Sequence, residues 1–223
     1  MIKQGPIAVR RAGETDSDFS FRIHCLAFDN DVAKKETYYC RDQDSVKDDC
    51  TSLMHELDSV IKLLKERSKK EVHRSVNTSM RYFGEPGSRT CWHVGNSDLK
   101  SCNCFLGGCE TCWAMIDSVD YPKLVEYLKK HGKNIKGCGP FHENSVSIDP
   151  RSLQKRGIKV RYSVQRPGDF VLIGPGFLHA VMNVGFNDAT AMNVITWAVA
   201  HNEDITRKYC NVCSEEEIGR KPR

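Results

Sequence analysis

Long apolar runs are missing from this sequence of 223 residues. No window approaches the roughly 20 consecutive apolar residues that a membrane-spanning helix needs, which argues against a membrane protein. The N-terminal stretch MIKQGPIAVRRAGETDSDF also lacks the apolar segment of a secretory signal. We therefore expect a protein of the cytosol or nucleus, where cysteine thiols stay reduced.

A strong excess of either charge is absent too, since 33 lysines and arginines oppose 29 aspartates and glutamates and leave a net charge of +4. This balance is compatible with an acidic partner, but an ordinary soluble surface explains it better. Repeats and low-complexity linkers are also absent, and 39% hydrophobic with 28% charged residues is typical of a globular protein. The length allows one core, with or without appendages.

Cysteine, in contrast, is plentiful: the chain contains 11, an odd number. In a reducing compartment these predict metal ligands or small buried hydrophobic side chains rather than disulfides. Four of them form the pattern C-x-C-x4-C-x2-C, which alone would indicate zinc: Cys102, Cys104, Cys109 and Cys112. Cys102 and Cys104, however, alternate with polar residues on an expected strand, so we favour packing in the core over zinc.

Short strand-like segments and glycine-rich turns dominate the sequence. Expected strands include PIAVR, FRIHCLAF and ETYYC within residues 1–44, then SVNTSMRYF, SCNCFLGG, GIKVRYSVQ, two within FVLIGPGFLHAVMNVG, and ATAMNVITWAVA. Two helices are expected, one over residues 44–70, where apolar residues recur at helical spacing, and one over DYPKLVEYLKKHGK. Many short strands with few helices indicate a mainly β sandwich or barrel rather than a doubly wound sheet.

Two stretches carry a specific resemblance to a known family. The first is VNTSMRYFGEPGSRT, followed by the spaced pairs H-x-x-N and S-x-N, and the second is RPGDFVLIGPGFLHAVMNVGFNDATAMNV. In this order they resemble the JmjC domain, the cupin-like jelly-roll (double-stranded β-helix) with flanking helices of the Fe(II)/2-oxoglutarate dioxygenases. They are most similar to the UTX-type histone H3 lysine 27 demethylases.

The resemblance suggests three parts of the chain. Residues 76–200 would form the jelly-roll, and residues 1–75, which match only in general character, would form a mixed strand and helix segment that packs on this core. Residues 201–223 are a C-terminal tail with one CxxC knuckle, Cys210 and Cys213. The UTX-type enzymes carry a zinc domain after the core, so these two cysteines could bind zinc if the other ligands came from elsewhere.

Enzymes of this kind hold Fe(II) with two imidazoles and one carboxylate and leave three positions open for 2-oxoglutarate and O₂. The resemblance places the histidines at His93 and His179, but the carboxylate position is Gly95, which has no side chain. In one interpretation, the fold remains and demethylation is impaired or lost. In the other, Asp98 or an external anion takes the carboxylate's place. Asp98 would point to the opposite face of a continuous strand, so we favour the first interpretation.

The expected cosubstrate pocket is also altered. Four residues match family positions that contact 2-oxoglutarate or line its pocket: Thr90, Ser101, Asn103 and Asn193. The lysine that pairs with the distal carboxylate of 2-oxoglutarate falls at Gly84. Such a charge-assisted bond contributes about 1.5–3 kcal/mol, so its loss should weaken cosubstrate binding roughly tenfold or more. Tyr82 matches a tyrosine near the methyl-lysine pocket.

The resemblance implies a nuclear protein of the histone-demethylase class, with Fe(II) and 2-oxoglutarate as its cofactors, although Gly95 and Gly84 put the use of both in doubt. Its expected partners are the methyl-lysine tail of histone H3 and other chromatin proteins, with neither a membrane nor direct sequence-specific DNA binding. One alternative is a catalytically dead module that binds a histone tail or chromatin. Another is a zinc-binding protein built on the cysteines of residues 102–112.

Overall fold

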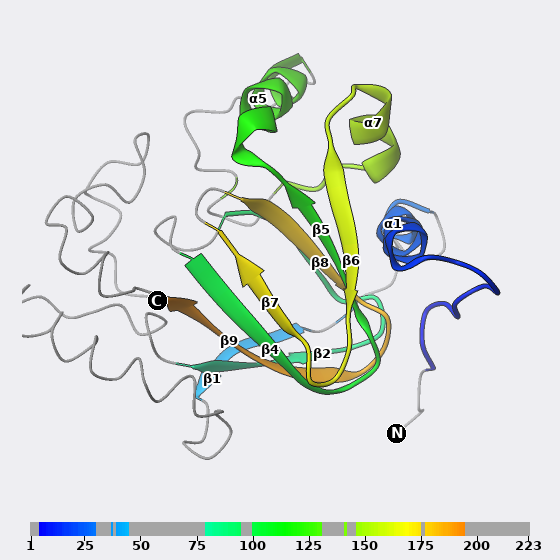
Figure 1. The fold of residues 1–223 in the computed structure, drawn as a ribbon, viewed down its shortest axis with the longest axis vertical. Helices are drawn as coiled ribbons and strands as arrows, with labels where there is room; N and C mark the ends of the chain where they lie inside the picture. Colours follow the sequence, from blue (N-terminus) through cyan, green and yellow to red (C-terminus); the bar gives the residue numbers. More distant parts are fainter. Residues whose placement is uncertain are drawn as a thin grey trace, which may run out of the picture.

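The structure, a computed structural model, describes residues 5–29, 37, 39–44, 79–94, 100–130, 141, 146–174 and 177–194. Two antiparallel sheets lie face to face in this part of the chain (Figure 1). The five-stranded sheet contains, in spatial order, β1 (Tyr39–Asp44), β2 (Met80–Gly84), β9 (Asn187–Val194), β4 (Lys100–Gly108) and β7 (Phe170–Ile173). The four-stranded sheet contains β3 (Arg89–His93), β8 (Leu178–Asn183), β5 (Thr111–Ile116) and β6 (Val160–Gln165).

The order of the strands is that of a jelly-roll. From β2 to β5 the chain alternates between the two sheets, and it does so again from β6 to β9. The turn between β4 and β5 uses Gly108, whose φ of 98° is unfavourable for other residues. A Cβ there would also lie 2.3 Å from the carbonyl oxygen of Phe186. The mainly β jelly-roll predicted from the sequence is therefore confirmed.

The register of the strands decides which side chains face the space between the sheets. In the five-stranded sheet, Ser101 of β4 pairs with Asn193 of β9, and Asn103 pairs with Ala191. These residues lie on the inner face, because the buried cluster of Trp113, Ile173 and Val181 joins the two sheets on that side. Alternate residues of each strand lie on the outer face.

A short helix covers part of the outer face of the four-stranded sheet. Helix α1 (Asp16–Leu26) begins at Thr15, whose hydroxyl accepts a hydrogen bond from the backbone N–H of Asp18. Its buried side chains Phe19 and Ile23 pack against the sheet in a cluster that also contains Cys112, Val164, Met182 and Val184. The expectation of a strand at FRIHCLAF, residues 21–28, is therefore wrong. Its apolar residues fit both periodicities, and the Thr15 cap with the i, i+4 pair of aromatic and aliphatic anchors favours the helix.

The rest of that outer face is covered by a second cluster. Helix α5 (Tyr121–Lys130) follows a single 3-10 turn, η3 (Ser118–Asp120), and buries Leu124 and Leu128. Helix α7 (Pro150–Lys155) is capped by Asp149 and buries Leu153. These leucines contact Trp92, Ile116 and Leu178 in one core cluster. The predicted helix over residues 120–133 is thus present from Tyr121 to Lys130.

Of the other expectations from the sequence, one is wrong and two lie largely outside the described residues. PIAVR does not form a strand, although the backbone N–H of Ile7 donates to the carbonyl oxygen of Val184. The predicted helix over residues 44–70 lies outside the described residues except Asp44, which ends β1. Likewise, residues 195–200 of the last predicted strand lie outside them. Among the described residues, none of the helices is both long and apolar enough to cross a membrane.

Candidate functional site

Two histidines from distant parts of the sequence lie side by side on the inner face of the four-stranded sheet. His93 ends β3, His179 lies in β8, and the two residues are directly paired in the antiparallel register. Their ring centroids are 4.0 Å apart. A shift of register in β3 lets Thr90 and His93 both face the space between the sheets. Strand pairing therefore brings together the two imidazoles that the sequence predicts as metal ligands.

A backbone carbonyl orients each of the two rings. Nδ1 of His93 lies 2.8 Å from the carbonyl oxygen of Cys91, and Nδ1 of His179 lies 3.3 Å from that of Phe177. A carbonyl oxygen only accepts hydrogen bonds, so these contacts favour the tautomer with the proton on Nδ1 and a lone pair on Nε2. Histidines that bind metals are commonly fixed in this way. The pair can therefore present two nitrogen ligands to one divalent ion.

His179 is also held in its neutral form. Its side chain is 5% exposed, and burial lowers its pKa well below the usual value. The neighbouring His93 lowers the pKa further, whereas the contact with the Phe177 carbonyl raises it. The ring stacks on Trp113 of β5, with centroids 5.9 Å apart. A neutral, rigidly packed imidazole is the form that binds a metal ion.

Four of the other predicted site residues face the histidines from the opposite sheet, whereas Thr90 lies in the same strand as His93. Tyr82 of β2, Ser101 and Asn103 of β4, and Asn193 of β9 all lie on the inner face of the five-stranded sheet. Thr90 and Asn103 each form a hydrogen bond within the protein. The backbone N–H of Val181 donates to the hydroxyl of Thr90 at 3.0 Å, and Nε2 of Gln165 donates to Oδ1 of Asn103 at 3.0 Å.

Gln165 also connects this wall to the histidine pair. Its Oε1 accepts a 2.8 Å hydrogen bond from the indole Nε1 of Trp113, the residue that stacks on His179. Gln165 is 1% exposed, so these bonds form away from water and hold the side chains firmly. A chain of contacts therefore runs from Asn103 on one sheet to His179 on the other.

This arrangement can be compared with known proteins. The family model described as "JmjC domain, hydroxylase" matches residues 80–194, more than half of the chain. The chain belongs to the JmjC family. Demethylases of this family generally use Fe(II) and 2-oxoglutarate and act on histones, and they are generally nuclear.

Curated JmjC relatives are lysine demethylases by name. The chain is 34% identical over 133 residues to the "Putative lysine-specific demethylase JMJ16" of Arabidopsis thaliana, covering 58% of this chain and 11% of that protein. It is 33% identical over 128 residues to the "Probable lysine-specific demethylase 4F" of Homo sapiens, covering 56% and 20%. With the "Lysine-specific demethylase 4D" of Rattus norvegicus, it shares 32% over 128 residues, covering 56% and 25%. The chain thus spans a quarter or less of the length of these relatives.

The JmjC cofactors fit this site unequally. Two oriented imidazoles suit a divalent metal ion such as Fe(II). The far end of the inner space does not suit the distal carboxylate of 2-oxoglutarate, because Gly84 is buried and has no room for a longer side chain. A Cβ at position 84 would lie 2.3 Å from Nδ2 of Asn183 and 2.7 Å from Oδ1 of Asn187. The cosubstrate therefore lacks the lysine contact expected at this position.

Several predicted positions lie outside the described residues: Gly95, Asp98, Cys210 and Cys213. Within the described part, no three histidine, cysteine, aspartate or glutamate side chains are grouped to hold a metal ion. The four-cysteine zinc pattern is not supported. Cys102 and Cys104 lie on the outer face of the five-stranded sheet, 4% and 5% exposed, whereas Cys112 packs under α1 on the outer side of the other sheet. The preference for core packing agrees with this placement.

Sequence reasoning missed three residues near the site, Trp113, Gln165 and Asn183. A signal was present for Asn183, which follows His179 by four positions in a strand and therefore faces the same way. The sequence contained no signal for Gln165, because a polar residue at the end of an alternating strand is usually exposed. Its burial depends on an acceptor, a donor and a neighbouring strand that only the folded protein brings together.

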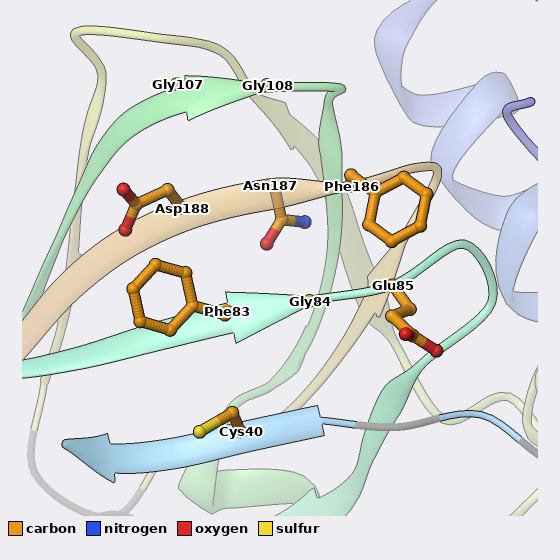
Figure 2. Close-up of a pocket in the computed structure, with 9 residues that line it drawn as sticks. All are labelled: Cys40, Phe83, Gly84, Glu85, Gly107, Gly108, Phe186, Asn187 and Asp188. Atoms are coloured by element: carbon orange, nitrogen blue, oxygen red, sulfur yellow. The ribbon is translucent and has the colours of Figure 1, made fainter. Parts of the chain in front are cut away.

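A separate groove of about 470 Å³ lies at the turn end of the five-stranded sheet (Figure 2). Its lining includes the exposed rings of Phe83 and Phe186 and the backbone of Gly107. One of its two carboxylates, that of Asp188, is paired with Arg81 at 2.6 Å, and the other belongs to Glu85. The groove adjoins Gly84 and Asn187 but includes neither histidine.

Proposed function

We propose that this JmjC chain is a demethylase-like protein of the histone H3 lysine 27 class, with impaired catalysis, that recognises a methylated histone tail in the nucleus. The proposal rests on the paired imidazoles of His93 and His179, whose orienting carbonyls favour a lone pair on each Nε2. Family membership and the named relatives support the demethylase class. The histone target and nuclear location come from the resemblance of the motifs.

The roles proposed for the residues come from the resemblance to the JmjC domain, and their placement supports them. His93 and His179 would hold the metal ion through Nε2, and Trp113 would keep the His179 ring in place. Bound Fe(II) would supply the oxidising chemistry for hydroxylation of a substrate. Thr90, Ser101, Asn103 and Asn193 would line the ligand space, although Gly84 leaves the distal end without its lysine. Asp98 remains a weak substitute for the carboxylate missing at Gly95.

Tyr82 is proposed to lie beside the methyl-lysine. Its ring centroid is 6.3 Å from that of Tyr39 in the neighbouring strand β1. Both residues face the inner side of the sheet, since Tyr39 pairs with Gly84 two positions beyond Tyr82. Two neighbouring tyrosine rings attract a methylated ammonium group through their electron-rich faces.

Mass spectrometry tests the activity directly. A trimethylated histone H3 lysine 27 peptide is incubated with the full chain, Fe(II) and 2-oxoglutarate, and the stepwise loss of methyl groups is followed. We expect little or no turnover from the wild type and measurable turnover from Gly95→Glu, with His179→Ala added to Gly95→Glu as the inactive control. Robust wild-type demethylation would contradict the impairment, and turnover that survives His179→Ala would contradict the site.

The second candidate is a binding module without catalysis, favoured by the filled space beside Gly84. It predicts that methylated peptide binds equally well with and without metal, and that Gly95→Glu gains no activity. Fluorescence anisotropy of a labelled peptide, recorded with and without metal, separates the candidates. Tyr82→Ala should weaken binding in either case and so tests the peptide site itself. Phe83→Ala, in the same strand but on the outer face, is the matched control.

A further inference from the structure

A buried cluster of neutral polar side chains fills the turn end of the space between the sheets. Its members come from four elements or their ends: Ser88, Thr111, Asn183 and Asn187. They are 0%, 4%, 3% and 9% exposed, respectively. A cluster so well buried must obtain its hydrogen bonds from within the protein.

The members of this amide cluster bond mainly to one another. Oδ1 of Asn183 accepts from Nδ2 of Asn187 at 2.6 Å and from the hydroxyl of Thr111 at 3.2 Å. Nδ2 of Asn183 donates to the hydroxyl of Ser88 at 3.0 Å, and that hydroxyl donates to the carbonyl oxygen of Glu85. Asn183 is therefore the centre of the cluster.

Gly84 marks where this cluster meets the opposite sheet. The three atoms nearest to a Cβ at position 84 belong to Asn183 and Asn187, at 2.3 to 2.7 Å, closer than real Cβ contacts come. In Figure 2, Asn187 projects from β9 toward β2 at Gly84. The two amides thus occupy the space into which a side chain at position 84 would extend.

Cations are absent from the cluster's bonding. Within the described residues, none of its hydrogen-bond partners is a lysine or arginine. Arg81 in the same strand as Gly84 lies on the outer face and pairs with Asp188. Arg161, on the edge strand β6, has a side chain 73% exposed and pairs with Asp117. A carboxylate pushed into the cluster would lose its hydration without gaining an opposite charge, which is unfavourable.

We propose that Asn183 and Asn187 form a plug that excludes a distal carboxylate, so the site selects short 2-oxo acids over the dicarboxylate 2-oxoglutarate. This inference rests on the proposed function in one respect, since it takes the His93–His179 pair as the place where the ligand binds. The ligand class is a 2-oxo monocarboxylate, with pyruvate as the probe. Its tail ends before the plug and carries no second charge.

Ligand binding without turnover tests the selection. The full chain is first titrated with Mn(II), a redox-stable ion, while tryptophan fluorescence is recorded, because Trp113 stacks on His179. His179→Ala should abolish this response. The Mn(II)-loaded protein is then titrated by calorimetry with pyruvate and with 2-oxoglutarate. We expect pyruvate to bind more tightly than 2-oxoglutarate by about threefold or more, and equal or tighter binding of 2-oxoglutarate would overturn the plug.

A stability cycle tests the plug independently of any metal. Gly84→Ala should lower the urea midpoint of unfolding, because the new methyl group meets Asn183. In a protein that already carries Asn183→Ala, the same substitution should lower the midpoint much less. Gly107→Ala in β4 of the same sheet is the matched control, since nothing lies within 4 Å of its Cβ position. Equal losses from Gly84→Ala in both backgrounds would overturn the inference.

The two tests separate failure of the inference from failure of the proposed function. If Mn(II) does not bind, the ligand site is wrong, while the stability cycle still decides whether the plug exists. If Mn(II) binds but Gly84→Ala costs the same stability in both backgrounds, the histidine site is supported and the plug is contradicted. A gain-of-contact variant completes the test: Gly84→Lys with Asn183→Ala should shift preference toward 2-oxoglutarate by about tenfold relative to Asn183→Ala alone.

Discussion

The two ends of the inter-sheet space use polar side chains in opposite ways. At one end, backbone carbonyls occupy Nδ1 of His93 and His179 and so favour a lone pair on each Nε2. At the other end, the amides of Asn183 and Asn187 bond to each other and to neighbouring hydroxyls. The first end is prepared for a ligand, whereas the second is closed by its own hydrogen bonds. The same jelly-roll can therefore keep two imidazoles oriented as metal ligands would be, while the end proposed for the cosubstrate is filled by its own side chains.

The largest expected effect is at the histidine end. Removing the ring in His179→Ala should weaken Mn(II) binding at least about 100-fold, or about 3 kcal/mol, because one of two imidazole ligands is lost. Fluorescence titration measures the change. His24→Gln is the control, since His24 is also a buried histidine, 7% exposed, but lies on α1 outside the inter-sheet space. Equal loss in both variants would show a general structural effect.

At the closed end, we expect a substitution to lower the free energy of unfolding rather than the affinity for metal. Asn183→Ala removes the amide that bonds to the buried hydroxyls of Ser88 and Thr111 and to Nδ2 of Asn187, and we expect a loss of up to about 3 kcal/mol in the free energy of unfolding. Mn(II) affinity should change by less than about threefold, because the histidine contacts are untouched. Urea unfolding and metal titration of the same sample measure both quantities. A large loss of metal affinity would mean that the two ends are not independent.

The sequence predicted these two ends with unequal success. His93 and His179 could be placed because each is embedded in a run of motif residues, and paired strands must bring opposing residues together. The plug could not be foreseen from Gly84, because the side chains that fill its space come from β8 and β9. A glycine in a strand signals close approach, but not which atoms approach.

The fold shows the same contrast: patterns within a segment could be predicted, whereas contacts with residues distant in the sequence could not. Alternation and glycine turns predicted a mainly β sandwich or barrel, since they are local consequences of strands with one buried face, and the resemblance to the JmjC domain added the jelly-roll. The segment at residues 21–28 failed because an apolar residue at every second position competed with helical spacing. Docking against Cys112 and Met182 under the Thr15 cap decided the outcome. Tertiary packing of this kind is not encoded within the segment.

The buried histidine of α1 should make the stability of the protein depend on pH, although it lies outside the space between the sheets. Burial lowers the pKa of His24 from 6.5 to about 4, although a contact with the Cys112 carbonyl opposes the shift. Protonation therefore favours the unfolded chain, so stability is full above pH 6.5 and declines as the pH falls toward 4. We expect His24 to account for about 2 kcal/mol lost between pH 7 and pH 5. Urea unfolding of wild type and His24→Gln at both pH values measures it, and equal slopes would contradict the assignment.

The smallest expected effect comes from the outer face of the strand that carries Gly84. Arg81 forms two hydrogen bonds with Asp188, at 3.0 and 2.6 Å, and its guanidinium lies 5.2 Å from the ring centroid of Phe83. Both partners are about a quarter exposed, so water and salt weaken the pair. Arg81→Gln should reduce stability by less than about 1 kcal/mol, and less still in high salt. Because Arg81 faces away from the plug, the preference between pyruvate and 2-oxoglutarate should not change. A change in that preference would place the selectivity in the end of β2 as a whole rather than in the amides behind Gly84.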